Sequence, residues 1–179
     1  MYHVATRGNN KHAIVRTDVH RNLWVKHVTR ITRAYGWVVF AWCLMTNHYH
    51  LVLQIGDRGL SNGMRDLNGP FAREMNKRLG RCDHWFGKRF WSECFETDAH
   101  LLNACRYTDL NPCEAGMCEH PGEYVWGGYR AAVGIELPAP FHDVHGLHRL
   151  CGATTPREGA TAYAEFVLSE LQRRRAAAA

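Results

Sequence analysis

Residues 37–55 of the chain read WVVFAWCLMTNHYHLVLQI, and the pattern of this stretch decides the fold. An unbroken apolar and aromatic run over residues 37–44 leads into a turn at residues 45–47, and a second apolar run follows over residues 48–55. Two such runs joined by so short a turn predict a β-hairpin. Because both runs are almost wholly apolar, we expect this hairpin to lie at the centre of a sheet.

The segments on either side of the hairpin alternate between strand and helix patterns. Gly69 and Pro70 should kink or interrupt the helix that follows the hairpin. Asp18 and Asp98 stand where helix N-caps are expected. The predicted order is a strand at 2–6, a helix at 18–35, the hairpin, a helix at 60–79, a strand at 89–97, a helix from 98 to about 110 and a last amphipathic helix at 160–175.

Length and composition limit the possible classes of protein. The chain has 179 residues, of which 46% are apolar and 22% charged, as in a single globular domain with a short appendage. No stretch approaches the roughly 20 apolar residues of a membrane span, and the first residues lack the pattern of a signal peptide. The seven cysteines form no CxxC motif, so we expect them to be reduced core residues of a cytoplasmic protein that has no membrane partner.

The charge favours a polyanionic partner. The 22 Lys and Arg against 17 Asp and Glu give a net charge of +5, and most of the cations are arginines, which recognise phosphate well. Basic and aromatic residues are interleaved over positions 65–91, as in surfaces that bind single-stranded nucleic acid, although a solvated helix face followed by core aromatics has the same pattern. The candidate DNA contacts are Arg7, Arg65, Arg73, Arg78, Lys88 and Arg89 for phosphates, and Trp85 or Phe86 for base stacking.

His48 and His50 are candidate metal ligands. Side chains at positions i and i+2 of a strand point to the same face, so the two imidazoles should project side by side and could hold one ion. The alternative is a pair of half-buried strand histidines without a metal. An HxH pair alone does not decide between the two interpretations.

Tyr107 and Asn111 are spaced i, i+4, so they should share one face of the helix that begins at residue 98. A tyrosine hydroxyl can attack phosphorus if a nearby cation stabilises its phenolate. An Asn oxygen beside two imidazole nitrogens suits Mg²⁺ or Mn²⁺ better than a closed zinc site. Alternatively, Tyr107 is a core aromatic with a solvated hydroxyl, and Asn111 ends a helix before Pro112.

Two further groups of possible zinc ligands have unsuitable spacing. One comprises His142, His145, His148 and Cys151, and the other comprises Cys113, Cys118 and His120. Residues three apart on a helix advance about 300° per step, which spreads the first group too far around the axis to share one ion. The second group matches no standard zinc motif. We therefore expect neither group to bind metal.

Five motifs occur in order along about the first three quarters of the chain: YHVATRGNN at 2–10, LMTNHYHLVLQ at 44–54, FGKRFW at 86–91, RYTDLNPCEAGMC at 106–118 and YVWGGYRA at 124–131. Together they resemble the HUH-type single-tyrosine transposases, specifically the REP-associated tyrosine transposases. The chain departs from that group in two places. The turn before the histidines usually reads Met-Pro-Asn and here has Thr46 in the middle, and the helix that contains Pro70 is normally continuous.

The resemblance implies metal ligands at His48 and His50, with Tyr49 as the bulky residue between them, a third ligand at Asn111 and the nucleophile at Tyr107. It implies that this tyrosine cuts single-stranded DNA through a covalent 5′-phosphotyrosine intermediate, with a divalent metal as cofactor and foldback hairpins as the recognised DNA. It also implies an α+β fold with a mainly antiparallel central sheet and helices packed against it. To this fold the sequence pattern adds a helical C-terminal extension.

We therefore expect an HUH nickase domain over residues 1–130, and a linker with a C-terminal helical extension over residues 131–179. The expected activity is that of a transposase: a metal-dependent endonuclease and strand transferase that acts on single-stranded or hairpin DNA, with Mg²⁺ or Mn²⁺, as a monomer or homodimer. Two alternatives stay open. One is a catalytically silent protein that binds DNA hairpins, and the other is a hydrolytic metallonuclease in which Tyr107 is structural.

Overall fold

The computed structural model describes residues 1–178, and its centre is a four-stranded antiparallel sheet. The strands are β1 (Tyr2–Arg7), β2 (Val38–Leu44), β3 (His48–Gln54) and β4 (Trp91–Cys94). They lie in the order β2-β3-β1-β4, so the predicted hairpin of β2 and β3 pairs with the N-terminal strand. The α+β class inferred from the sequence is confirmed.

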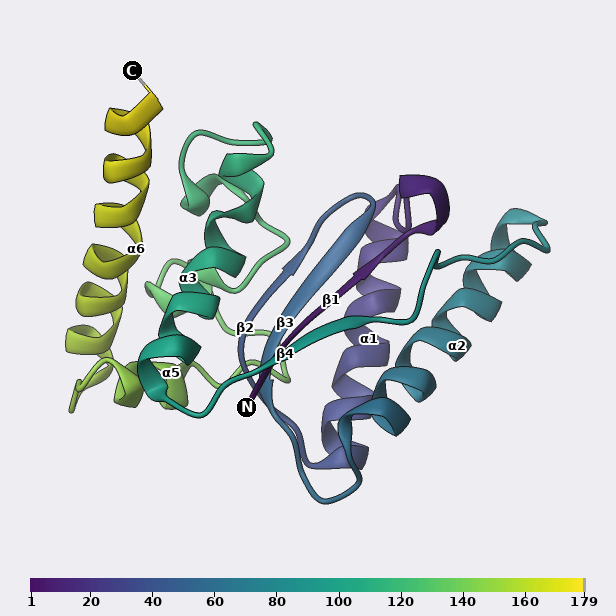
Figure 1. Ribbon diagram of the computed structural model, residues 1–179, viewed down its shortest axis with the longest axis horizontal. Helices are drawn as coiled ribbons and strands as arrows, with labels where there is room; N and C mark the ends of the chain where they lie inside the picture. Colours follow the sequence, from purple (N-terminus) through teal and green to yellow (C-terminus); the bar gives the residue numbers. More distant parts are fainter. Residues whose placement is uncertain (179) are drawn as a thin grey trace.

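The helices form a layer on each face of this sheet (Figure 1). They are α1 (Asp18–Tyr35), α2 (Leu60–Leu79), α3 (Asp98–Glu114), α4 (Tyr129–Ala132), α5 (Val144–Leu150) and α6 (Pro156–Ala178), with 3₁₀ turns η1 (Asn9–Lys11) and η2 (Pro121–Glu123). The first two helices cover one face, and α3, α5 and α6 cover the other. None of the helices within residues 1–178 is long and apolar enough to cross a membrane.

The alternation of side chains along β3 produces two separate hydrophobic cores. Tyr49, Leu51 and Leu53 belong to the core beneath α1 and α2, whereas Val52 belongs to the core beneath α3 and α6. All four of these side chains are fully buried. A strand that is apolar on both faces therefore lies between two layers of helices, as the unbroken apolar run predicts.

Threonines, and not the predicted aspartates, cap α1 and α3. The side chain of Thr17 accepts a hydrogen bond from the His20 amide, and that of Thr97 accepts one from the His100 amide. The expected caps, Asp18 and Asp98, occupy the first turn instead. There their negative charge interacts favourably with the positive end of the helix dipole.

Pro70 does not interrupt α2, which runs without a break from Leu60 to Leu79. A proline in a helix leaves the carbonyl four residues earlier without its donor. That carbonyl belongs to Asp66, and the guanidinium of Arg30 on α1 donates to it at 3.0 Å. The neighbouring helix thus replaces the lost hydrogen bond, which the sequence of α2 alone could not reveal.

The helix α3 also extends farther than predicted, past Pro112 to Glu114. Proline disfavours helical geometry in the residue before it, which is why the sequence predicts an end near residue 110. Leu110, Asn111 and Pro112 are all buried in the structure, so packing overrides this preference. As a result, Asn111 lies inside the helix, one turn after Tyr107.

The two edges of the sheet differ. At one edge β4 is only four residues long, shorter than the predicted strand over 89–97, and all four residues are exposed. At the other edge the chain after α3 covers β2, where the Asp143 amide donates to the Val39 carbonyl at 2.8 Å and Phe141 enters the core. The prolines at 138 and 140, which predict a linker, lie in this covering segment.

All seven cysteines are free thiols, but they are not all core residues. Cys43 and Cys105 are buried as expected. Cys82 and Cys94 are exposed, so the prediction of a core position is wrong for these two. The reason is local: Cys82 follows the end of α2, and Cys94 lies on the exposed edge strand.

Candidate active site

The hairpin strand β3 presents His48 and His50 on the face of the sheet that α3 covers. Tyr49, between them, points to the opposite core and donates a hydrogen bond to Asn68 Oδ1 at 2.6 Å. The row of residues across the sheet at His50 continues with Ala5 on β1 and Trp91 on β4. Because Ala5 has only a methyl group, the sheet surface beside His50 stays open.

The ring of His48 has a defined orientation and tautomer. The amide nitrogen of Asn47 donates to the Lys11 carbonyl at 3.2 Å, so its oxygen faces His48 Nδ1, 2.7 Å away. This oxygen can only accept, so a neutral His48 carries its proton on Nδ1. Its Nε2 therefore presents a lone pair, which points at Asn111 Oδ1 on α3 at a distance of 3.2 Å.

His50 is held by His3 of β1, which lies on the same face of the sheet, two residues from the register partner Ala5. His50 Nδ1 and His3 Nε2 are 2.9 Å apart and share a buried hydrogen bond. A second imidazole in this position fixes the orientation of the first, as the outer partners of metal-bound histidines do. His3 is thus a positioning residue for His50.

The three histidines are neutral at physiological pH. Burial lowers the pKa of His50 to about 3, with smaller contributions from Arg7 and from the protonated forms of His3 and His48, which disfavour a further positive charge nearby. Burial also lowers the pKa of His3 to about 4, and it lowers that of His48. Neutral imidazoles are the form that binds metal ions.

The helix α3 brings Tyr107 and Asn111 to these histidines. The Tyr107 ring lies edge-on to both His3 and His50, with ring centroids 5.7 and 5.8 Å away. It is 40% exposed, so it is not the buried core aromatic of the alternative interpretation. Asn111 is buried and faces His48.

This set of side chains fits a divalent metal. Two lone-pair atoms, His48 Nε2 and Asn111 Oδ1, face each other at 3.2 Å. Such a separation is close to the roughly 3.0 Å between neighbouring oxygens around an octahedral ion with ligands at about 2.1 Å. Within residues 1–178 there is no group of three or more His, Cys, Asp or Glu side chains that could hold a metal, so the amide of Asn111 is needed to complete a three-ligand set.

These side chains line a cavity of about 870 Å³. His48, His50, Tyr107 and Asn111 form one side of it. The other side comes from β1, the turn η1 and the segment before β4, which contribute four basic residues: Arg7, Lys11, Lys88 and Arg89. The cavity therefore combines a nucleophilic hydroxyl, possible metal ligands and cations that can bind phosphate.

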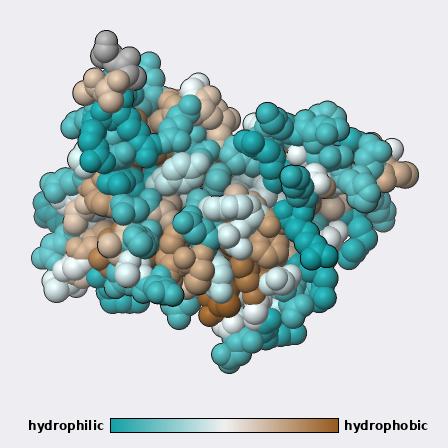
Figure 2. Space-filling model, in the orientation of Figure 1, coloured by the Kyte–Doolittle hydropathy of each residue, from teal (hydrophilic) through white to brown (hydrophobic). Residues whose placement is uncertain are grey.

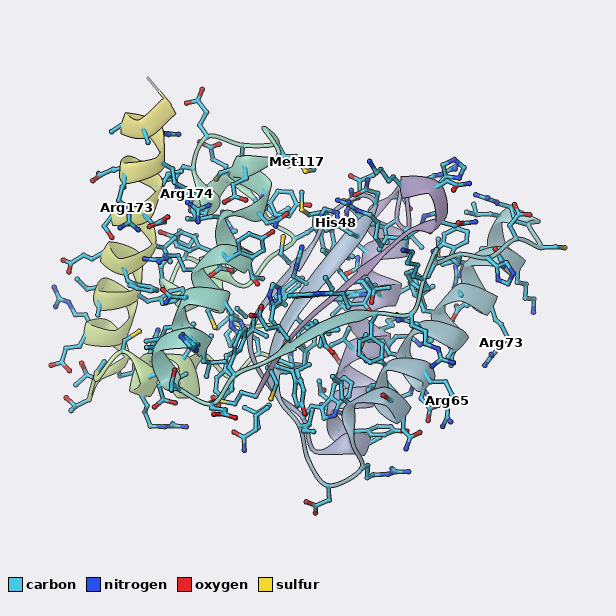
Figure 3. All side chains as sticks on the ribbon, viewed as in Figure 1. His48, Arg65, Arg73, Met117, Arg173 and Arg174 are labelled. Atoms are coloured by element: carbon cyan, nitrogen blue, oxygen red, sulfur yellow. The ribbon has the colours of Figure 1, made fainter. Side chains whose placement is uncertain are left out.

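The six predicted phosphate contacts separate into two groups. Arg7, Lys88 and Arg89 line the cavity. The other three are on α2, on the opposite side of the sheet; Figure 3 shows Arg65 and Arg73 on the outer surface of that helix, far from His48. Two of these are paired within the helix, Arg65 with Asp66 and Arg78 with Glu74.

The two predicted stacking residues lie at the core beneath α1 and α2. Trp85 is 7% exposed and belongs to the core beneath α1 and α2, and Phe86 packs against that core. The open aromatic ring at the cavity is Trp91, which is 52% exposed. Trp91 is the last residue of the interleaved basic and aromatic stretch, but the sequence pattern does not distinguish it from the buried Trp85.

The residues that support the candidate metal ligands have no sequence signal of their own. His3 and Asn47 lie in two of the recognised motifs, but their roles depend on contacts across the sheet and with the turn η1. A strand pattern does indicate that His3 and Ala5 share a face. It does not indicate which strand pairs with β1.

The other potential ligands are not brought together. His142 Nε2 bonds the Phe40 carbonyl at 3.0 Å and His148 Nε2 bonds the Ala132 carbonyl at 2.8 Å, so both are buried and engaged. Cys113 and Cys118 are in contact, with 3.5 Å between their sulfur atoms. Neither group forms a metal site within the described residues.

Comparison with known proteins gives a family and a fold. Residues 1–100 match the family described as IS200-like transposases. The structure is similar to that of a REP-associated tyrosine transposase bound to a REP hairpin, with a TM-score of 0.62 and 16% identity over 80% of this chain and 86% of the other. A candidate transposase from Deinococcus radiodurans aligns with a TM-score of 0.43 and 19% identity over 55% of this chain and 81% of the other. Among curated proteins there is no significant match.

Proposed function

This chain belongs to the IS200-like transposase family, and on that premise we propose that it is a metal-dependent tyrosine DNA nickase and strand transferase that acts at hairpin-forming DNA. The family match confirms the resemblance inferred from the sequence motifs, and it makes the chain a member of a family of enzymes that act on DNA. The covalent mechanism, the metal and the hairpin substrate are parts of the proposal.

The observation that carries the proposal is the position of Tyr107. Its partly exposed ring lies edge-on to His50, one helical turn before Asn111, at the wall of a basic cavity. A phosphate that enters the cavity would meet the tyrosine hydroxyl, the possible metal ligands and several cations together. This is the constellation that nucleophilic phosphoryl transfer requires.

In the proposed reaction the Tyr107 oxygen attacks a phosphorus atom of the DNA strand. A bond from tyrosine to phosphorus forms, the bond from phosphorus to the 3′-oxygen breaks, and the proton lost by tyrosine is balanced by one gained at that 3′-oxygen. The product is a 5′-phosphotyrosine and a free 3′-hydroxyl. Attack by a 3′-hydroxyl on this intermediate rejoins the DNA and restores the tyrosine, so no external energy source is needed.

The residues around Tyr107 have separate parts in this scheme. His48, His50 and Asn111 would hold Mg²⁺ or Mn²⁺, which when bound stabilises the negative charge that develops on the phosphate. His3 and Asn47 keep the two imidazoles in place. Arg7, Lys88 and Arg89 bind flanking phosphates of the strand.

The hairpin substrate is proposed from the similar structure, which is described as bound to a REP hairpin. The cavity supports a single strand next to the hairpin, because Tyr107 must reach a phosphate inside a groove formed by β1, β4 and α3. Bases on either side of that phosphate can then contact protein. Unpaired flanks of a hairpin provide such a strand.

The experiment is a labelled hairpin oligonucleotide with unpaired flanks, incubated with Mg²⁺ or Mn²⁺ and analysed on a denaturing gel. The wild type should form a protein–DNA adduct. Tyr107→Phe keeps the ring but lacks the hydroxyl, so binding should persist while cleavage and adduct disappear. If the protein is a hydrolytic nuclease, Tyr107→Phe should still cut the DNA. If it is a silent hairpin binder, neither the wild type nor Tyr107→Phe should cut.

A further inference from the structure

A second cavity, of about 760 Å³, lies beside the first and is separated from it by Tyr107. The two share the side chains of Ala5, His50, Trp91 and Tyr107, so both open onto the proposed nucleophile. The second one extends along β4 and the first turns of α3. Nothing in the proposed reaction at the phosphate uses this space.

The two cavities differ in charge. Four basic residues, at positions 7, 11, 88 and 89, and one carboxylate, that of Glu114, line the first. The residues that line the second, all within the described part of the chain, include no Lys or Arg and one carboxylate, that of Glu93. Phosphates of a bound strand therefore favour the first cavity. The second cavity suits an uncharged part of the same DNA strand.

Trp91 stands between the cavities with its ring open. It is 52% exposed, although tryptophan is seldom so exposed, and it meets the edge of His3 with ring centroids 5.3 Å apart. Ala5, its partner on β1, is too small to cover it. Apolar residues also reach the surface on this side of the molecule, around the middle and lower end of the sheet (Figure 2). An open indole in a strand-binding groove is a platform for stacking a base.

Two polar side chains of the second cavity could read the edge of a base. Glu93 lies on the same face of β4 as Trp91, opposite His3 of β1, and its carboxylate can only accept hydrogen bonds at neutral pH. Asn103 Oδ1 accepts from Arg106 at 2.8 Å, which leaves the amide NH₂ of Asn103 as a donor. One acceptor and one donor can pair with the Watson–Crick edge of an unpaired base, because every base presents a donor beside an acceptor there.

We propose that the second cavity is a nucleobase pocket, in which the base next to the phosphate attacked by Tyr107 stacks on Trp91 and donates a hydrogen bond from its Watson–Crick edge to Glu93. The inference rests on the proposed function, since it concerns the same DNA strand. It adds a base-binding subsite formed by protein side chains to the phosphate contacts of the first cavity.

Binding without cleavage tests the pocket separately from catalysis. The probe is a fluorescent hairpin oligonucleotide with about ten unpaired nucleotides on each flank, measured in EDTA, with one abasic nucleotide placed at each flank position in turn. For the wild type, one position should lower affinity about 5- to 150-fold, the range expected for loss of one stacked base. Trp91→Ala should lower affinity for the intact probe by a similar factor. In this variant an abasic nucleotide at that position should no longer change the affinity.

Matched variants keep this test interpretable. Trp91→Phe retains an aromatic face and should restore the abasic profile. Leu137→Ala removes another exposed apolar side chain, at 91% exposure, outside both cavities, and should behave like the wild type. All four residues of β4 are exposed, so we expect Trp91→Ala to fold, and thermal melting checks this.

The hydrogen bond to Glu93 is tested at the position that the abasic scan identifies. Glu93→Leu, which removes the acceptor, should lower affinity for the intact probe and should leave affinity for the probe that is abasic at that position unchanged. An abasic profile that is even along the flanks, or identical in the wild type and Trp91→Ala, would overturn the pocket while leaving the proposed function intact. Adduct formation with Mn²⁺ on the same probes tests that function, and failure to bind any probe would overturn both.

Discussion

His48 on β3 and Asn111 on α3 are 63 positions apart in the chain, and His48 Nε2 meets Asn111 Oδ1 at 3.2 Å. The hydrogen bond from His48 Nδ1 to Asn47 leaves Nε2 with a lone pair. Two lone pairs at this distance repel each other unless a cation or a proton lies between them. This relationship makes the histidine pair of the strand and the amide of the helix one site.

Removal of the histidine ligands should abolish metal-dependent cleavage. We expect His48→Ala and His50→Ala each to lower the cleavage rate with Mg²⁺ or Mn²⁺ by at least about 100-fold, because each removes a direct ligand. Asn111→Ala should be milder, since water can replace a neutral oxygen ligand. Cleavage rates on hairpin oligonucleotides, with thermal melting as the control for folding, give the comparison. Full activity of the His48→Ala, His50→Ala double variant would contradict the metal site.

His3 should act through His50 and not directly on DNA. His3→Ala leaves His50 Nδ1 without its partner, so we expect the Mn²⁺ concentration for half-maximal cleavage to rise about 10- to 100-fold. At saturating Mn²⁺ most of the activity should return. A merely structural role for His3 would instead lower the melting temperature and leave the metal dependence unchanged.

The salt dependence of binding should identify the groove that the strand follows. Replacing Lys88 and Arg89 together by alanine should flatten the slope of log K against log salt by up to about 1.4, because each lost phosphate contact on a single strand contributes about 0.7. Arg73→Ala with Arg78→Ala is the matched pair on the far side of the sheet. If the α2 pair changed the slope and the cavity pair did not, the strand would follow α2 instead.

Asp109 should make the protein less stable as the pH rises. Its carboxylate is buried on α3 and accepts a hydrogen bond from Tyr163 of α6 at 2.7 Å. Burial raises its pKa to about 7, and the bond from Tyr163 only partly offsets this. Between about pH 4 and pH 7 the folded chain keeps a proton that the unfolded chain has lost, so stability falls across this window, by up to about 4 kcal/mol.

Asp109→Asn tests this directly, because asparagine is of similar size and still offers an oxygen to Tyr163. The variant should lose the part of the pH dependence between pH 4 and pH 7 and should be the more stable protein at pH 8. Urea unfolding of both proteins at pH 5, 6, 7 and 8 measures the difference. Parallel curves for the two proteins would show that the buried carboxylate does not titrate in this window.

The sequence was sufficient for features that depend on neighbours along the chain. The apolar runs on either side of the turn at residues 45–47 determine the hairpin, and strand periodicity determines that His48 and His50 share a face. Helical periodicity determines that Tyr107 and Asn111 share a face of α3. These features follow from backbone geometry, which repeats every two residues in a strand and about every 3.6 in a helix.

The tertiary structure decided what depends on pairing between distant segments. Pro70 is accommodated because Arg30 of another helix bonds the free Asp66 carbonyl. The interleaved basic and aromatic stretch divides because α2 packs on the far face of the sheet. This packing buries Trp85 and leaves Lys88, Arg89 and Trp91 of that stretch at the cavity.

His3 supports His50, and Trp91 stands open beside Tyr107, because β1 pairs with β3 on one side and β4 on the other. Residue spacing alone contains no information about that pairing. Its stability comes from two hydrophobic cores whose residues lie far apart in the chain, and only their packing brings the site together.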